Sequence, residues 1–116
     1  MKHYIEGHKC IENGSMALTL TGKEARVLLC DYAIIHAKWS GSGVSGTIKF
    51  EVSLSTKTNE IDWYELESEA YTVSSDTGDV ELNLKDLCHG LLRAKYVPIA
   101  GTGTINIKMN AKSIGG

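Results

Sequence analysis

The sequence predicts an all-β fold, an antiparallel β-sandwich of jelly-roll type with about eight strands and at most one short helical turn. Apolar and polar residues alternate with a period of two in several segments, which is the pattern of strands with one buried face. Gly, Asn and Asp separate these segments at short intervals, as in sandwiches and barrels. A length of 116 residues and a hydrophobic fraction of 42% fit one globular domain.

The clearest alternation lies in residues 47–55, where Ile48, Phe50, Val52 and Leu54 are apolar and every residue between them is polar. Neighbours along a strand point to opposite sides of a sheet, so this segment predicts a strand with those four side chains facing the core. The same period predicts further strands at residues 16–21, 79–84 and 104–112.

Other segments favour strands less directly. Residues 27–30 are continuously apolar, as expected of a strand covered on both faces. Pro98 is expected to end a strand or to mark a sheet edge, and the glycine-rich residues 40–46 are expected to form a flexible hairpin loop. The remaining expected elements are strands at 33–39, 71–73 and 92–97, and one helical turn at 85–89. Residues 59–69 could form a turn of helix, but a strand through Trp63 and Leu66 is favoured.

The domain organisation follows from the same pass along the chain. Residues 1–15 have little periodicity and are predicted to form an N-terminal arm or an edge strand, and residues 16–116 a single sandwich domain. The net charge is −2 and no basic block is present, which argues against a nucleic-acid partner. The longest mostly apolar stretch, residues 25–37, is interrupted by charges and too short to span a bilayer. We therefore expect a soluble protein made in a cytoplasm, with three free cysteines.

Three patterns could carry chemistry, and each has a simpler interpretation. Asp76-Thr77-Gly78 matches the signature of retroviral-type aspartic proteases, but two serines precede it, and this composition is ordinary for a turn between strands. His3, His8 and Cys10 match no standard zinc spacing. The neighbours Cys88 and His89 would point to opposite faces of a strand. The prediction is a non-enzymatic protein with no catalytic residue, metal or cofactor.

Trp39, Trp63 and Tyr64 are the candidate interaction residues. In a strand, Trp63 and Tyr64 must point to opposite faces, so that one fills the core and the other is exposed. Exposed aromatic rings on β-sandwiches stack on sugars or contact proteins.

Four stretches of the chain also carry a resemblance to a known class of proteins. Residues 45–55 begin Ser-Gly-Thr and then alternate, Asp62-Trp63 follows, residues 92–96 read Leu-Arg-Ala-Lys-Tyr, and residues 101–112 begin Gly-Thr-Gly-Thr and end in Lys. Together they resemble small β-sandwich structural proteins of tailed-bacteriophage virions, over roughly residues 40–112. The first half also looks similar to discoidin and carbohydrate-binding sandwiches.

The phage resemblance implies a virion component, such as a capsid decoration (cement) protein or a head or tail accessory protein. Such a protein would be made in the host cytoplasm, form a homo-oligomer, and bind other capsid or tail proteins, with no nucleic acid or membrane as partner. The resembling positions are structural, so no catalytic residue carries over. The alternative function is a carbohydrate-binding module that uses exposed Trp and Tyr rings.

Overall fold

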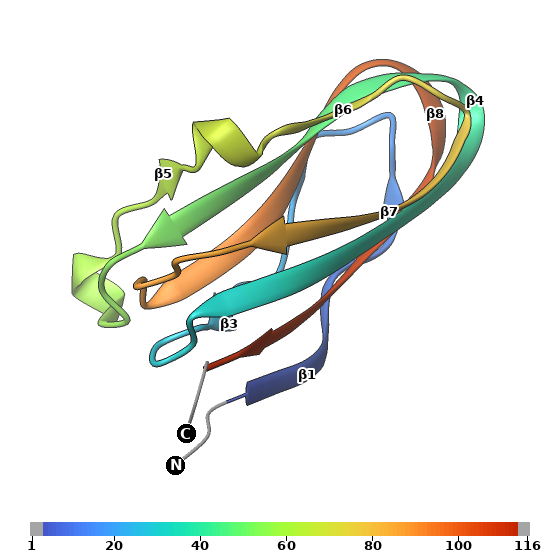
Figure 1. The fold of residues 1–116 in the computed structure, drawn as a ribbon. Coiled ribbons are helices and arrows are strands. Elements are labelled where there is room, and N and C mark those ends of the chain that lie inside the picture. Colours follow the sequence, from blue (N-terminus) through green and yellow to red (C-terminus); the bar gives the residue numbers. More distant parts are fainter. Residues whose placement is uncertain (1–3, 114–116) are drawn as a thin grey trace.

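A computed structural model describes residues 4–113 and shows the predicted all-β fold (Figure 1). Residues 4–113 contain eight strands and two short 3₁₀ turns, and no helix long and apolar enough to cross a membrane. The elements are β1 (Tyr4–Ser15), β2 (Leu20–Thr21), β3 (Ala25–Arg26), β4 (Tyr32–Ser53), η1 (Thr58–Glu60), β5 (Tyr64–Glu65), η2 (Glu67–Glu69), β6 (Tyr71–Val73), β7 (Thr77–Leu84) and β8 (Leu91–Lys112).

The two longest strands, β4 and β8, form the centre of the molecule. Each has 22 residues, and they pair antiparallel along almost their whole length. Strands β5, β6 and β7 pair with the other side of β4, and β1, β2 and β3 pair with the other side of β8. All eight strands therefore belong to one open antiparallel sheet, where the sequence predicts two separate sheets.

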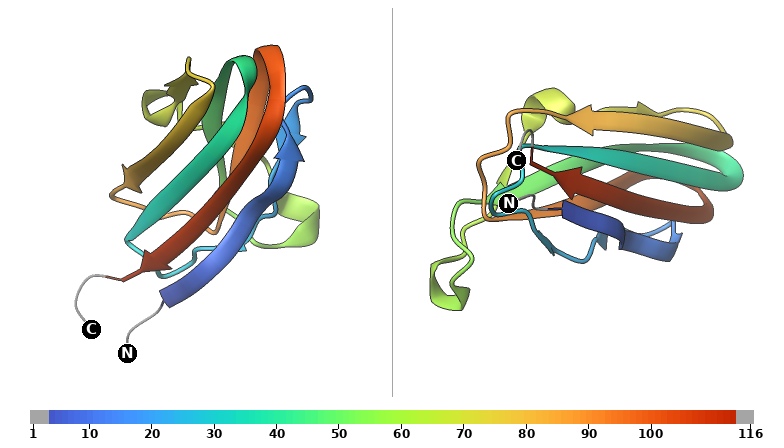
Figure 2. Two further views of the ribbon diagram at one scale, coloured as in Figure 1. Left: turned by 90° about the vertical axis from the view of Figure 1, so that its right-hand side faces the viewer. Right: turned by 60° about the horizontal axis from the view of Figure 1, so that its bottom comes forward.

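This single sheet folds over on itself, because β4 and β8 both bend in their middle (Figures 1 and 2). One half of the folded sheet contains β7 and β1 beside the first part of β4 and the last part of β8. The other half contains β5, β6, β2 and β3. The two halves enclose the core between them, so a sandwich arises from one continuous sheet.

Paired β-bulges produce the bend. Ser42 pairs with Thr102 and Ser45 pairs with Ala100, so β4 has one residue more than β8 between these pairs. The next pair is Gly46 with Pro98, so β8 has one unpaired residue there, Ile99. A bulge bends a strand and adds one residue, which switches the side to which later residues point. Accordingly Trp39, at an odd position before the bend, is buried, and so is Val44, at an even position after it.

The core confirms the alternation seen in the sequence. Ile48, Phe50 and Val52 are at most 1% exposed, and the inward residues of β8 lie opposite them. The other central buried side chains are Ala33, Ile35, Ala37, Leu92, Ala94, Tyr96, Ile105, Ile107, Met109 and Ala111.

Two regions expected to interrupt strands lie inside them. Residues 40–46 are part of β4, although they were expected to form a hairpin loop, and Pro98 lies within β8, paired with Gly46, instead of ending a strand. Proline is tolerated in a sheet at bulges, where the ladder is already disrupted. The Gly and Pro signals therefore mark a bend in two continuous strands.

Two segments expected to be strands are largely turns. Of residues 16–21, only β2 is extended, and residues 16–18 form a turn and a bend. Residues 27–30 form a tight turn in which the Cys30 N–H donates to the Val27 carbonyl at 2.8 Å. Leu54 follows the end of β4 and is 68% exposed, so its predicted inward direction is also wrong.

The remaining local predictions differ by small shifts. The helical turn expected at 85–89 is absent, and the two 3₁₀ turns are η1 and η2, on either side of β5. The strand expected through Trp63 and Leu66 is the two-residue β5 between them. Residues 4–15 are an edge strand, β1, and not a free arm.

Candidate interaction surfaces

Trp39 lies in the core, which corrects its prediction as a surface residue. It is 4% exposed, its Nε1–H donates to the Ser75 carbonyl at 2.9 Å, and its ring centroid lies 6.2 Å from that of Tyr71. The ring also covers Gly78 of β7, where a Cβ would come within 2.0 Å of it. In the part of β4 before the bulge, the odd-numbered residues point inward, and Trp39 is one of them.

Trp63 and Tyr64 lie beside each other at the start of β5. Trp63 is half-buried, and the guanidinium carbon of Arg93 lies 4.0 Å from its ring centroid, within cation–π range. The Arg93 Nε donates to the Glu51 carboxylate at 2.8 Å, which fixes the guanidinium over the ring. Tyr64 is 44% exposed and meets the His89 ring edge-on at 6.0 Å. These two aromatics remain candidates for an interaction surface.

Both belong to the end of the sandwich opposite the bend, which we call the loop end (Figure 1). Its loops are held together by backbone hydrogen bonds, from Val27 N–H to the Gly90 carbonyl at 2.9 Å, and from Gly90 N–H to the Ser53 carbonyl at 2.8 Å. The Leu87 N–H donates to the Asp31 carbonyl at 2.8 Å. The loop end consists of residues 27–31, 54–64 and 85–90.

Large apolar side chains gather at the loop end. Four of the seven exposed large hydrophobic residues in the described part of the chain lie there, namely Leu28, Leu29, Leu54 and Tyr64. Leu29 also has a φ of +72° in its turn, at a position where Gly or Asn is usual. A left-handed conformation costs a leucine about 1–2 kcal/mol. Leu29 is therefore an exposed leucine held under backbone strain.

Asp76 has a structural role in the bend. Its Oδ1 accepts from the Val44 N–H at 3.0 Å, and its carbonyl accepts from the Gly41 N–H at 2.7 Å. The carboxylate therefore holds the bulge of β4 against the start of β7, where Thr77 and Gly78 are already in the strand.

The thiols and histidines are dispersed. Cys10 and Cys30 are buried, Cys88 is exposed, and all three are free. Burial raises the pKa of the Cys10 thiol to about 12. His8 Nε2 lies 2.9 Å from the Lys23 carbonyl oxygen, and His3 lies outside the described residues. Within residues 4–113, no three His, Cys, Asp or Glu side chains are grouped so that they could hold a metal ion.

Sequence reasoning missed a strong separation of charge. Residues 58–84 contain eight carboxylates and no Lys, Arg or His, whereas β8 contains four basic residues and no acidic one. Because β5, β6 and β7 all pair with the same side of β4, this segment runs along one edge of the folded sheet. The signal was available as a charge run, but only the pairing shows which edge it occupies. The carboxylates belong to Glu60, Asp62, Glu65, Glu67, Glu69, Asp76, Asp79 and Glu81.

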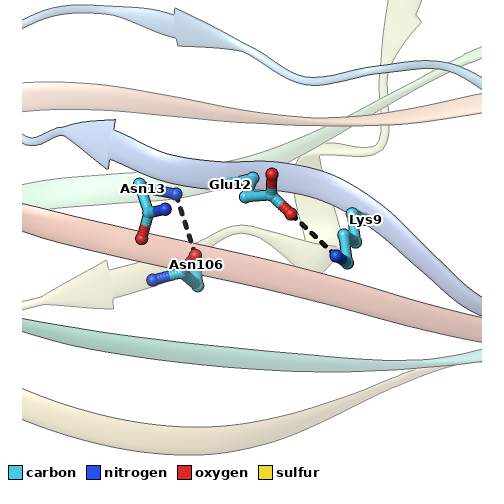
Figure 3. A network of polar contacts seen from close by, with 4 residues as sticks. All are labelled: Lys9, Glu12, Asn13 and Asn106. Atoms are coloured by element: carbon cyan, nitrogen blue, oxygen red, sulfur yellow. Dashed lines mark hydrogen bonds and ion pairs between the residues drawn. The ribbon is translucent and has the colours of Figure 1, made fainter.

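β1 and β7 are the outer strands of one half of the folded sheet, and their pairing with the neighbouring strands differs in regularity. β1 has register shifts against β8 at three places, and Gly7 and Asn13 have positive φ. The Asn13 N–H donates to the Asn106 side chain at 2.8 Å, beside a Lys9–Glu12 ion pair of 2.9 Å (Figure 3). In contrast, β7 pairs with β4 from Thr77 to Leu84 without a shift. Bulges protect an edge from further pairing, so β1 is protected and β7 is open.

No protein-family model matches this chain, and no curated protein matches its sequence. A solved structure, that of the SPBc2 prophage-derived protein YomS, matches over 97% of this chain and 96% of that chain. The TM-score is 0.55 and the sequence identity is 16%. This likeness shows that the two chains share a fold over nearly their full lengths.

Proposed function

We propose that the protein is a structural component of a bacteriophage particle, either a capsid decoration protein or a head or tail accessory protein. It acts through contacts with other virion proteins and as a homo-oligomer, and it carries out no chemistry. The shared fold with a prophage-derived protein supports a phage origin. The residue patterns that resemble virion β-sandwich proteins support a place in the particle.

The observation that carries this proposal is the apolar loop end. Leu28, Leu29 and Leu54 are exposed on loops that backbone hydrogen bonds hold in place, and Tyr64 is exposed at the start of β5, so the surface is preformed. Interfaces depend on a few apolar and aromatic anchors that become buried in the partner, and preformed anchors lose little conformational entropy on binding.

The test is association with particles. Phage particles are purified by density gradient from a host whose phage genome encodes the chain, and the chain is quantified by mass spectrometry. We expect it at a constant ratio to the major capsid or tail protein. We also expect Leu54→Asn to lower that ratio at least tenfold. The matched control is Leu18→Asn, which changes a similarly exposed leucine outside the loop end and keeps the wild-type ratio. A chain found only in the unassembled fraction, or an unchanged ratio for Leu54→Asn, contradicts the proposal.

A second candidate function is glycan binding at the same end. Tyr64 borders a shallow cleft with Ser55, Glu60 and Asp62, which combines an exposed ring with hydrogen-bonding groups. Such a combination suits a sugar. A glycan array with Tyr64→Ala and Trp63→Ala separates the two functions, because specific glycan binding that both variants abolish favours the carbohydrate-binding module.

A further inference from the structure

The far side of β7 is an open strand edge. β7 pairs with β4 over all its positions, from Ser40↔Thr77 to Ala33↔Leu84, and with no other described strand. In an antiparallel strand, every second residue directs its N–H and C=O away from the neighbour it pairs with. The border position of β7 is visible in Figure 2. An unbroken row of backbone donors and acceptors of this kind can accept one more strand.

The two faces of β7 specify which side chains that strand would need. Asp79 and Glu81 are exposed on the outer face, and Val80 and Leu82 point toward the core but are only half-buried. An added strand with apolar residues beside Val80 and Leu82 would complete the cover of the core at this edge. Its alternate residues would lie opposite Asp79 and Glu81, where positive charge is favoured.

The surroundings reinforce this preference. Asp79 contacts His36, and the cross-strand partners of Asp79 and Glu81 on β4 are Lys38 and His36. Lys38 and His36 both lie on the β4 side of β7. Segment 58–84 itself carries carboxylates and no basic residue, so it adds only negative charge along the open side.

Two registers of β7 against a second copy of itself bring like charges together. A two-fold antiparallel pairing of β7 with β7 centred on Val80 would place Asp79 opposite Glu81, and one centred on Glu81 would place that residue opposite itself. Like charges directly across a strand pair are destabilising. In these two registers the charges on β7 disfavour self-pairing, whereas a strand of opposite charge meets no such repulsion.

We propose that β7 binds an extended segment of a partner protein in which basic and apolar residues alternate, added to the sheet as a further strand beside β7. This inference rests on the proposed function and deepens it, because it states the chemistry of one virion partner. The partner would contribute Lys or Arg opposite Asp79 and Glu81, and apolar side chains beside Val80 and Leu82.

The experiment uses the full chain and two synthetic octapeptides, one alternating Lys and Val and the other alternating Glu and Val. Binding is followed by amide chemical shifts in two-dimensional NMR spectra. We expect the Lys–Val peptide to shift the amides of β7 and to bind at least tenfold more tightly than the Glu–Val peptide. The double variant Asp79→Lys, Glu81→Lys should reverse that preference. The matched control is Glu6→Lys with Glu12→Lys on β1, which makes the same change in charge at the other edge. This control variant should still prefer the Lys–Val peptide.

Equal binding of the two peptides, shifts on β1 instead of β7, or an unchanged preference in the double variant would overturn the inference. A further measurement separates it from the proposed function. If the Asp79→Lys, Glu81→Lys variant associates with particles as the wild type does, the inference about β7 fails while the virion role stands. If the wild-type chain never associates with particles, the virion role fails, whatever the peptides show.

Discussion

Replacing Leu29 with glycine tests whether this leucine is retained for contacts or for the fold. Leu29 has a φ of +72° and is 62% exposed. Glycine adopts this backbone conformation freely, so Leu29→Gly relieves about 1–2 kcal/mol of strain. The reason to expect this relief is the missing Cβ, and it does not depend on any neighbour.

Two losses oppose that gain. Full burial of a leucine side chain contributes about 1.5–3 kcal/mol, so the buried 38% of Leu29 contributes about 0.6–1.1 kcal/mol. The greater freedom of glycine in the unfolded chain costs about 0.5–1 kcal/mol. The free energy of unfolding of Leu29→Gly should therefore lie within about 1 kcal/mol of the wild-type value.

Urea denaturation followed by circular dichroism measures this difference. The reference variant is Leu84→Ala, which removes a leucine that is 2% exposed and should cost about 2–5 kcal/mol. In the particle-association assay, Leu29→Gly should lower incorporation while Leu29→Met keeps it, because methionine retains an apolar side chain of similar size. A loss of about 2 kcal/mol or more for Leu29→Gly would show that the side chain stabilises the fold, and the argument for a contact residue would be refuted.

Three further predictions concern the bend, a buried hydroxyl group and the thiols. Asp76→Asn keeps an oxygen that can accept from the Val44 N–H, so it should lower the free energy of unfolding by under about 1 kcal/mol. Asp76→Ala removes this acceptor and should lower it by about 1–3 kcal/mol. Equal losses for the two variants in urea denaturation would contradict the bulge contact. The Tyr96 hydroxyl is buried without a hydrogen-bond partner. Tyr96→Phe should therefore leave the free energy of unfolding unchanged or raise it by about 1 kcal/mol. A clear drop in the melting temperature of this variant would contradict the prediction. Because burial raises the pKa of Cys10 to about 12, its thiol stays protonated at pH 8. Iodoacetamide should therefore label the exposed Cys88 before Cys10, which mass spectrometry of the native protein can follow. Equal labelling of both cysteines would argue against this prediction.

Alternation over long segments predicted the inward-facing residues well, although the short alternating segment 16–21 is largely a turn. Ile48, Phe50 and Val52 face the core as predicted, and so do the alternating apolar residues of 104–112. This succeeds because a period of two is a local property, read from consecutive residues without knowledge of the partner strand. Leu54 continues the same pattern but is exposed, because β4 ends one residue earlier.

The interaction surface was harder to predict. Trp63 and Tyr64 were identified as aromatic residues in a polar segment, and they lie at the loop end. Trp39 was grouped with them, but it lies in the core, where it continues the alternation of Ile35 and Ala37. Leu28 and Leu29 were missed, because a run of apolar residues is typical of a buried strand, and only the hydrogen bond between Cys30 and Val27 shows a turn.

Composition and periodicity were sufficient to predict the all-β class, the approximate number of strands and most of the inward-facing residues, since each depends on a few neighbouring positions. The pairing of β4 with β8 decided the rest. This pairing makes the glycine-rich segment and the proline parts of one bend, folds a single sheet into two layers, and places residues 58–84 along one edge of that sheet. These features depend on contacts between residues far apart in the chain, and no local pattern specifies which distant segment becomes the neighbour.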